Sequence, residues 1–362
     1  MGRSRRGYGG YRGRKTANDM LKTIALVLGI LVLLVLGGLL WGQKYIVFTD
    51  NGPRLDAPFQ QKEEQKPLDG DVSVVVQPSG AQSEAENLPE PEPPVEEEPA
   101  LAAMELPLDA ILDGTSVQRL EEAGANGVIV EMKNQEGMLN WVSEQPFAAQ
   151  AGVNSRRTGV NEALRQWNAG EVYSIARVCC FRDNSLPYQR NDVALRATYG
   201  NWRDELGLRW LNPDSEAART YLAELCRELA ELGFDEILLE CCGFPTQGSL
   251  DSIVKNGSFA SGQYAAATEA FLTQVSTVLE PYDTAVAIRV ERASLAGEDV
   301  LSGLNAGVLE SCADRLWMAE DGGTPGLLEL LSSQGILEPE RRLVKVLPAF
   351  SGEVQEDSAV LN

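Results

Sequence analysis

Between residues 101 and 362 the sequence alternates short apolar runs with longer amphipathic stretches, and this pattern constrains the fold more than any other feature. The apolar runs are MELPL (104–108), GVIVEMK (127–133), VYSIARVCCF (172–181), EILLECC (236–242), TAVAIRVE (284–291), RLWMAE (315–320) and RLVKVLPAF (342–350). Most are separated by stretches with the apolar period of helices, such as SEAARTYLAELCRELAELGF (215–234). Apolar strands that alternate with helices form parallel sheets buried on both faces.

Seven strands within about 260 residues favour an α/β fold of the (β/α)8 type, the TIM barrel, over an open doubly wound sheet. No glycine-rich phosphate-binding loop follows the first run, which argues against a nucleotide-binding sheet. Only SGEVQEDSAVLN follows Phe350, which is short for a further helix and strand of ordinary length. We therefore expect the seventh strand (342–350) to pair with the sixth, and the eighth strand to be incomplete or missing.

The first 42 residues predict a membrane anchor. Residues 23–41 carry no charge, and as a helix they would nearly span a hydrocarbon core about 30 Å thick. No Ala-x-Ala-like cleavage site follows, so an uncleaved transmembrane helix over residues 23–42 is favoured over a cleaved signal peptide. Residues 1–22 carry seven basic side chains against one acid, which predicts a cytoplasmic N-terminal tail and an extracytoplasmic C-terminal domain in a single-pass protein of the cell membrane.

Residues 43–100 are rich in Pro and Glu and poor in large apolar side chains. Such a segment buries too little surface to fold, and we expect a disordered stalk between the membrane and a domain at residues 101–362. The net charge of −22 argues against nucleic acid as a partner of the exported part. The basic N-terminal tail is better explained by contact with lipid than with RNA.

Polar side chains lie at the expected carboxyl ends of the strands, where TIM barrels carry their chemistry. These positions hold Glu131, Lys133, Arg177, Asp183, Glu240, Arg289 and Glu291. The chain contains no histidine, which is difficult to reconcile with most hydrolases that use a Ser or Cys nucleophile.

Several segments resemble the bacterial putative glycoside hydrolase domain related to the glycoside hydrolase 13-type barrels. They are GVIVEMKNQEG, SIARVCCFRD, WLNPDSEAARTYLAELCRELAELGFDEILLECCGFP and, more faintly, AVAIRVE, and they cover most of residues 127–245. The resemblance implies that the family's acid and lysine of strand two are Glu131 and Lys133, and that the arginine of strand three is Arg177. The Trp-x-Asn-Pro element corresponds to Trp210, Asn212 and Pro213, and the strand-four acid to Glu240.

The same resemblance shows departures from the family pattern. Glu240 replaces an aspartate, Cys241 a tyrosine and Gly243 an arginine, while Arg289 falls where the family has an aspartate on strand five.

Glycosidic bond cleavage needs two carboxyl groups and no cofactor. Glu240 is the first catalytic candidate, with Glu291 on the neighbouring strand or Glu131 as its partner. The side chains expected to contact substrate are Lys133, Arg177, Asp183, Trp210, Asn212 and Arg289. The alternative is that Glu240 forms an internal ion pair with Arg177 or Lys133 and has no catalytic role.

Two adjacent cysteine pairs, Cys179–Cys180 and Cys241–Cys242, lie at the ends of neighbouring strands. Because successive strand residues face opposite sides, one cysteine of each pair is expected on each side, which argues against a four-thiolate metal site. A cross-strand disulfide remains open, and most of the six cysteines are expected to be small, buried apolar residues.

The sequence therefore predicts a membrane-anchored, extracytoplasmic glycoside hydrolase that acts on a polysaccharide or cell-wall glycan without a metal or cofactor. An inactive barrel that binds glycan or a partner protein in the cell envelope is the alternative.

Overall fold

A computed structural model describes residues 46–49, 52–55, 99–320, 324–352 and 354–361. The chain divides into two compact units, Met1–Pro91 and Glu92–Asn362. In the first unit, β1 (Ile46–Thr49) and β2 (Gly52–Leu55) form an antiparallel pair, so this short part of the predicted stalk has secondary structure. The predicted tail, the predicted membrane helix over residues 23–42 and most of the predicted stalk lie outside the described residues. Within the described ranges, no helix has the length and apolarity needed to cross a membrane.

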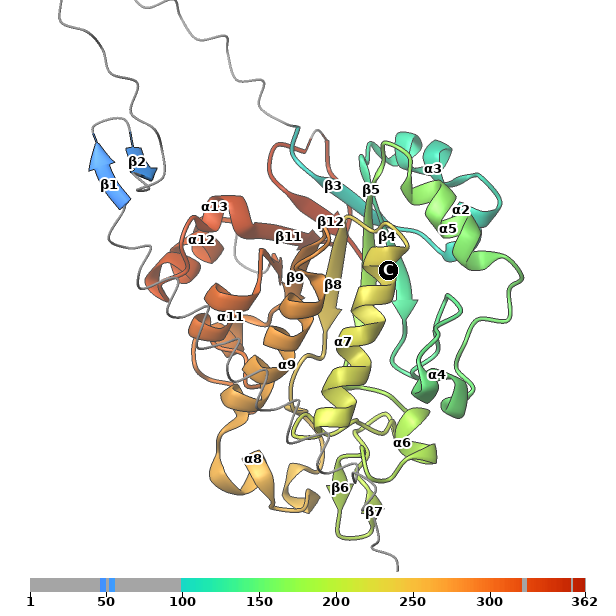
Figure 1. Ribbon diagram of the computed structural model, residues 1–362, viewed down its shortest axis with the longest axis vertical. Coiled ribbons are helices and arrows are strands. Elements are labelled where there is room, and N and C mark those ends of the chain that lie inside the picture. The colour runs from blue at the N-terminus through green and yellow to red at the C-terminus, as the bar shows by residue number, and fades with distance from the viewer. Residues whose placement is uncertain (1–45, 50–51, 56–98, 321–323, 353, 362) are drawn as a thin grey trace, which may run out of the picture. The chain divides into compact units, whose positions relative to one another are not determined.

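The second unit contains a closed barrel of eight parallel strands (Figure 1), which confirms the predicted TIM-barrel architecture. The strands are β3 (Ala102–Glu105), β4 (Gly127–Lys133), β5 (Tyr173–Cys179), β8 (Glu236–Glu240), β9 (Ala285–Arg289), β10 (Arg315–Ala319), β11 (Leu343–Leu347) and β12 (Ser358–Val360). They follow one another around the barrel in chain order, and β12 closes it against β3.

The expectation of an incomplete or missing eighth strand is wrong. The seventh strand, β11, pairs with the sixth, β10, as expected, but residues 358–360 then form β12 between β11 and β3. No helix lies between β11 and β12 in the described part of this connection, residues 348–352 and 354–357. Three residues suffice because β12 is paired on both sides: the Ser358 N–H donates to Leu101 O at 2.7 Å, and the Lys345 N–H donates to Asp357 O at 2.9 Å.

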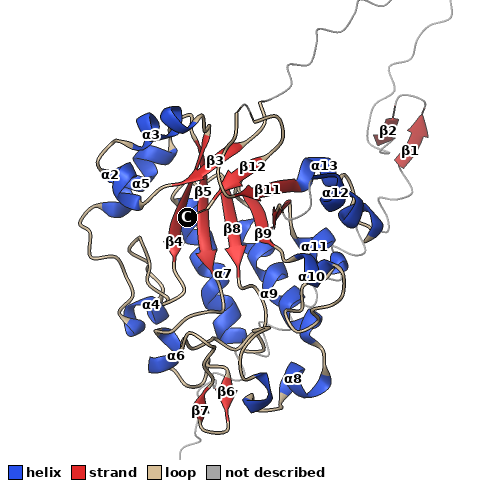
Figure 2. Ribbon diagram, turned by 180° about the vertical axis from the view of Figure 1, so that it is seen from behind, coloured by secondary structure: helices blue, strands red, loops and turns tan. Residues whose placement is uncertain are grey.

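Helices and loops surround the sheet. The helices are α2 (Leu108–Leu112), α3 (Ser116–Ala123), α4 (Pro146–Ala151), α5 (Val160–Asn168), α6 (Leu186–Gln189), α7 (Glu216–Glu231), α8 (Gly257–Ser261), α9 (Tyr264–Leu279), α10 (Arg292–Leu295), α11 (Ala306–Cys312), α12 (Thr324–Ser333) and α13 (Pro339–Arg342), with a 3-10 turn, η2, at Leu250–Ser252. A small hairpin, β6 (Arg196–Ala197) and β7 (Gly200–Asn201), lies in the loop after β5. The arrowheads of β4, β5 and β8 point toward the end of the barrel where α4, α6, α8 and this hairpin lie (Figure 2).

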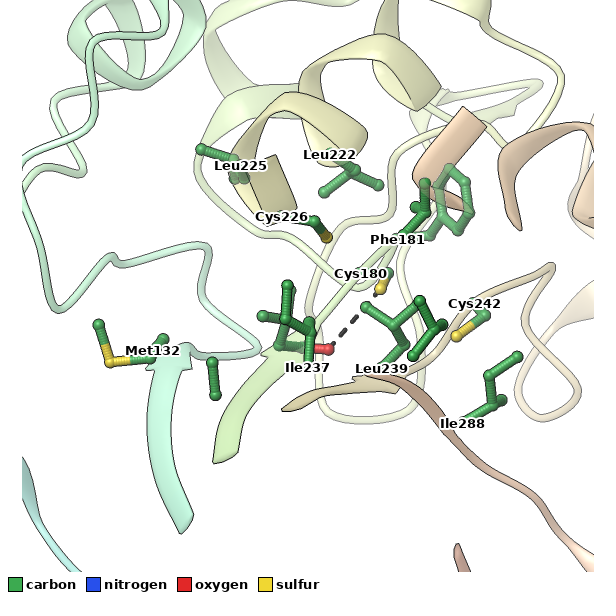
Figure 3. Close-up of a cluster of buried hydrophobic side chains, with 14 of the residues drawn as sticks. Met132, Cys180, Phe181, Leu222, Leu225, Cys226, Ile237, Leu239, Cys242 and Ile288 are labelled. Atoms are coloured by element: carbon green, nitrogen blue, oxygen red, sulfur yellow. Dashed lines mark hydrogen bonds between the residues drawn. The ribbon is translucent and has the colours of Figure 1, made fainter. Parts of the chain in front are cut away.

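The outer face of the sheet packs against amphipathic helices such as α7. The Ser215 side chain caps this helix by accepting a hydrogen bond from the Ala218 N–H, and its buried stripe includes Leu222 and Leu225. Figure 3 shows these leucines near Ile237 and Leu239 of β8. Burial of this apolar stripe is the main source of stability of such a helix.

The inside of the barrel is arranged in layers. One apolar side chain from each strand fills the central layer: Ala103, Ile129, Ile175, Leu238, Ala287, Trp317, Val344 and Ala359. Because strand side chains repeat every second residue, residues two positions earlier and two positions later on the same strands also face the interior. The earlier positions include Glu236, whose carboxylate is fully buried and accepts hydrogen bonds from Tyr173 Oη and Trp317 Nε1.

Candidate active site

The candidate site is the layer two residues beyond the apolar one, at the carboxyl ends of five consecutive strands. We call it the mouth cluster, and it consists of Glu105 on β3, Glu131 on β4, Arg177 on β5, Glu240 on β8 and Arg289 on β9. The alternation that places apolar residues in the central layer therefore also brings these charged residues together.

Arg177 links three carboxylates of the mouth cluster. Its Nη2 lies 2.8 Å from Glu105 Oε1 and 2.8 Å from Glu131 Oε1. Its Nη1 lies 3.5 Å from Glu240 Oε2. The Arg177 side chain is only 16% exposed, so these contacts are shielded from solvent and are stronger than surface ion pairs.

Glu240 and Glu131 have different surroundings. Glu240 has a guanidinium group near each of its oxygens, because Arg289 Nη1 lies 3.3 Å from Oε1 while Arg177 approaches Oε2. Burial raises the pKa of Glu131, and the nearby charges of Glu105 and Glu240 add to this, although Arg177 acts in the opposite direction. Glu131 also has the more exposed side chain, at 41% against 18% for Glu240. The site thus combines a carboxyl group that holds its proton more strongly than usual with a carboxylate placed between two cations.

Lys133 and Asp183, both predicted to contact substrate, form a buried ion pair with side chains 0% and 1% exposed. Lys133 Nζ lies 3.1 Å from Asp183 Oδ2 and donates to the backbone oxygens of Cys179 and Cys180. Burial is the largest influence on Lys133 and lowers its pKa, but Asp183 and the other surrounding groups outweigh it, so the pKa is raised. In this arrangement the pair ties the end of β4 to the loop after β5 and does not reach the surface.

Trp210 and Asn212 are also occupied by contacts within the protein. The Trp210 ring is buried, donates from Nε1 to Asp204 Oδ2 at 3.2 Å, and packs edge-on against Trp202. Asn212 is half-buried, and its side chain accepts a hydrogen bond from the Asp214 N–H at 3.2 Å. Both residues shape the long loop after β5.

The structure does not bring Glu291 into the mouth cluster. Glu291 is exposed and lies at the N-cap of α10, after β9 has ended at Arg289. The expected alternation does not extend past the end of the strand. Among the sequence candidates, Glu131, Arg177, Glu240 and Arg289 therefore lie together, whereas Lys133, Asp183, Trp210, Asn212 and Glu291 lie outside the cluster.

Glu105 is the cluster member that sequence reasoning missed. It lies within the predicted first strand, two residues after Ala103 of the central layer, and its side chain is 9% exposed. The alternation of side chains that pointed to Glu131 and Glu240 also applies to Glu105. The predicted first strand is short, however, so its sequence did not show which of its residues face the barrel interior.

Gly243 lies at a position where the family that the sequence resembles has arginine. Close packing around this position explains why it carries no side chain. A Cβ atom at this position would lie 1.6 Å from Ser302 O. The loop after β8 therefore packs directly against the backbone of the loop after β9, and no side chain fits between them.

Two surface cavities lie away from the mouth cluster. One, of about 360 Å³, is lined by residues of α9, of α11 and of the segments that follow these helices, including Tyr282 and Glu310. The other, of about 440 Å³, lies between the N-terminal parts of α4 and α7 and is lined by residues that include Phe147 and Tyr221. No group of three or more potential ligands in the described ranges is arranged to hold a metal ion.

Comparisons with solved structures show similarity of fold. The glycoside hydrolase domain of PgaB (BpsB) from Bordetella bronchiseptica aligns with a TM-score of 0.53 and 12% identity, over 73% of this chain and 94% of that one. A hypothetical protein from Ruminiclostridium thermocellum has 23% identity and a TM-score of 0.44, over 51% of this chain and 96% of that one. The glycoside hydrolase domain of PelA from Pseudomonas aeruginosa aligns with a TM-score of 0.39 and 13% identity, over 69% and 84% of the two chains. The first of these alignments supports the barrel assignment.

No curated protein matches the sequence significantly. A family match covers α2 through the loop after β9, and so includes four of the five strands that carry the mouth cluster. It extends over residues 110–299, more than half of the 362-residue chain. The chain therefore belongs to the family described as "Putative glycosyl hydrolase domain".

Proposed function

We propose that the barrel is a glycoside hydrolase that cleaves a polysaccharide by a two-carboxylate mechanism, with Glu131 as the general acid and Glu240 as the ionised carboxylate. The observation that carries the proposal is the contrast between these two groups. The pKa of Glu131 is raised by burial, whereas Glu240 lies between the guanidinium groups of Arg177 and Arg289. General acid catalysis of glycoside cleavage requires a carboxyl group that can hold a proton and a second carboxyl group close to it.

The roles follow from the chemistry of the bond. Glu131, the more exposed of the two, donates a proton to the leaving glycosidic oxygen as the bond to C1 breaks. Glu240 then either attacks C1 directly or removes a proton from the attacking water. One guanidinium contacts both carboxyl groups, so the two groups lie near each other at the barrel mouth. Lys133 and Asp183 serve as positioning residues in this scheme, because their buried pair fixes the end of β4 that carries Glu131.

The anchor and the relation to the glycoside hydrolase 13-type barrels are further parts of the proposal. Residues 23–42 would hold the protein in the membrane, with the barrel outside and an extracellular or cell-wall polysaccharide as substrate. Protease added to intact cells would then release the barrel by cutting between residues 43 and 100. Cleavage only after cell lysis would contradict this placement.

One observation favours the alternative of an inactive glycan-binding barrel. Arg177 contacts all three carboxylates of the mouth cluster, and such a network would neutralise the acids and occupy the space between them. In this case, soluble glycans would bind the protein without being cleaved.

Reducing-end release from a panel of polysaccharides by the full-length protein tests the proposal. Glu240→Gln and Glu131→Gln should each lower the rate by orders of magnitude, because each amide keeps the shape of the side chain but cannot ionise. Glu291→Gln tests whether the second carboxyl group is Glu131 or Glu291, and Glu122→Gln on the outside of α3 is the matched control. Full activity of Glu240→Gln would refute the mechanism, and binding without turnover would support the alternative.

A further inference from the structure

The two cysteine pairs meet across β5 and β8. The Cys241 side chain raises the pKa of Cys179, and the Cys180 side chain helps to raise that of Cys242, so the members of each cross-strand pair lie close enough to interact. Cys180 and Cys242 lie in the buried cluster between the sheet and the helices, with Cys226 of α7 nearby (Figure 3). Cys179 follows Arg177 by two residues and so faces the interior side, next to the mouth cluster.

Cys241 reaches Cys179 because the strand alternation is broken at this residue. On β8, Ile237 and Leu239 face the helices while Leu238 and Glu240 face the interior. Regular alternation would turn Cys241 outward. Its φ is instead +52°, a left-handed conformation that is costly for a residue with a Cβ atom. Such strain is retained only where the surrounding structure holds it, and functional sites are where it concentrates.

The backbone geometry suits a bond between these two sulfurs. Cys179 is the register partner of Glu240, so Cys241 is displaced from it by one residue along the neighbouring strand. The Phe181 N–H donates to Cys241 O at 3.0 Å, so the two segments still run side by side at this point, and in regular strands spaced about 4.8 Å apart residues offset by one position have Cα atoms about 6 Å apart. Disulfides span Cα separations of roughly 4.4 to 6.8 Å.

Accessibility separates the two thiols. Cys241 is half-buried, whereas the other five cysteines are buried. The neighbouring Cys241 side chain and burial raise the pKa of Cys179 well above its ordinary value, so Cys179 is held as the protonated thiol. Solvent-borne reagents therefore meet Cys241 first.

We propose that Cys179 and Cys241 form an oxidation site at the barrel mouth, where a low-molecular-weight disulfide converts the two thiols into an intramolecular disulfide. The Cys241 thiolate attacks one sulfur of the reagent, which forms a mixed disulfide and releases one thiolate that takes up the proton lost by Cys241. The Cys179 thiol then loses its proton and attacks the Cys241 sulfur, releasing the second thiolate, which is protonated in turn. Two protein thiols and one reagent disulfide thus become one protein disulfide and two reagent thiols.

Oxidation at this site acts directly on the mouth cluster. Glu240 is covalently joined to Cys241 and is the register partner of Cys179, so both ends of the new bond are attached to its immediate neighbourhood. Formation of the disulfide brings the two sulfurs to about 2.05 Å from each other. This movement displaces Glu240 relative to Arg177 and Arg289, whichever function the mouth cluster performs.

Thiol counting under native conditions tests the proposal without an activity assay. The full-length protein is equilibrated with glutathione disulfide and glutathione at a series of ratios, quenched with acid, alkylated and mapped by mass spectrometry without reduction. At oxidising ratios the six free thiols should fall to four, with fragmentation placing the disulfide between Cys179 and Cys241, and dithiothreitol should restore all six.

Variants assign the order of events. Cys179→Ser should stop at a mixed disulfide of glutathione with Cys241, and Cys241→Ser should show neither that adduct nor the disulfide. Cys312→Ser, a cysteine of α11, is the matched control and should oxidise like the parent protein. Six free thiols at every ratio would overturn the proposal, as would a disulfide between Cys180 and Cys242 in place of the expected one. Because the readout is covalent, these outcomes are distinct from a failure of the proposed hydrolase activity.

Discussion

Glu131 and Glu240 share a single guanidinium group: Arg177 Nη2 lies 2.8 Å from Glu131 Oε1, and Nη1 of the same side chain lies 3.5 Å from Glu240 Oε2. The two strands that carry these acids, β4 and β8, are separated by β5, which carries the arginine. The barrel thus places a cation between two acids by strand order alone.

The first prediction concerns the protonation of Glu131. Glu105→Gln removes a negative charge that raises the pKa of Glu131, so this pKa should fall, while Arg177→Met removes the opposing cation and should raise it. Carboxyl NMR titration of the protein measures both shifts, and Glu122→Gln on α3 should cause neither.

The same shift has a consequence for stability. Because the pKa of Glu131 is raised in the folded state, its contribution to stability is fully present below the unfolded-state pKa and is lost as pH rises through the folded-state pKa. Glu131→Gln should therefore flatten the dependence of the free energy of unfolding on pH in this acidic range. An unchanged slope would show that Glu131 titrates normally.

The second prediction concerns the buried ion pair. Lys133→Met leaves the Asp183 carboxylate buried without its cation and should lower the free energy of unfolding by about 3 to 5 kcal/mol. Adding Asp183→Asn should recover part of this loss, because the amide oxygen can still accept from the Ser185 and Leu186 N–H groups. Urea unfolding measures both variants. Arg341→Met, at the exposed Arg341–Glu338 pair, is the control and should change little.

Sequence pattern predicted most of the barrel because its strands are continuous apolar runs. Seven of the eight strands lie within the expected segments or overlap them, and the pairing of β10 with β11 is as expected. The eighth strand was missed because SAV is short and the described residues between β11 and β12 form no helix, so neither its length nor a helical period before it marks it. Its pairing depends on contacts with Leu101 and Lys345 that are distant in sequence.

Side-chain direction was predictable only where the strands are regular. Glu131, Arg177 and Glu240 follow the period of two and meet as expected. Lys133 does not follow the period of two. The strand register shifts between Glu131 and Lys133, and the Lys133 side chain is fully buried. Cys241 departs from the period through its positive φ, and residues beyond Arg289 are no longer strand. Irregular backbone at the strand ends is thus what separates the predicted site from the observed one.

The third prediction follows from the contact at Gly243. Gly243→Ala forces a methyl group against Ser302 O, a backbone atom that cannot move without shifting the loop after β9, so it should destabilise the protein by about 1 to 3 kcal/mol or more. Gly326→Ala on α12 adds a carbon that meets nothing within 4 Å beyond its chain neighbours and the backbone of its own helix, and should instead stabilise by up to about 1 kcal/mol. Thermal unfolding of the two variants compares them directly, and equal effects would contradict the close approach.

The last prediction concerns closure of the barrel by β12. Asp357 precedes this strand and has two roles: Oδ1 accepts a hydrogen bond from the Leu101 N–H at 2.8 Å, and Oδ2 forms an ion pair with Arg315. Arg315 in turn contacts the fully buried carboxylate of Glu236, 3.2 Å away. Asp357→Ala therefore leaves a backbone donor without its partner and removes one of the two acids that Arg315 contacts.

Asp357→Ala should lower the free energy of unfolding by about 2 to 4 kcal/mol, from one lost charge-assisted hydrogen bond and one partly buried ion pair. Asp357→Asn keeps the acceptor for Leu101 and should lose less. Hydrogen exchange locates the effect, because the Ser358 amide that donates to Leu101 O should exchange faster in the alanine variant. The exposed residue Glu356 forms an ion pair with Lys345, and Glu356→Ala is the neighbouring control. If Asp357→Ala behaves like Glu356→Ala, then β12 contributes little to closing the barrel, and the seven preceding strands hold it together.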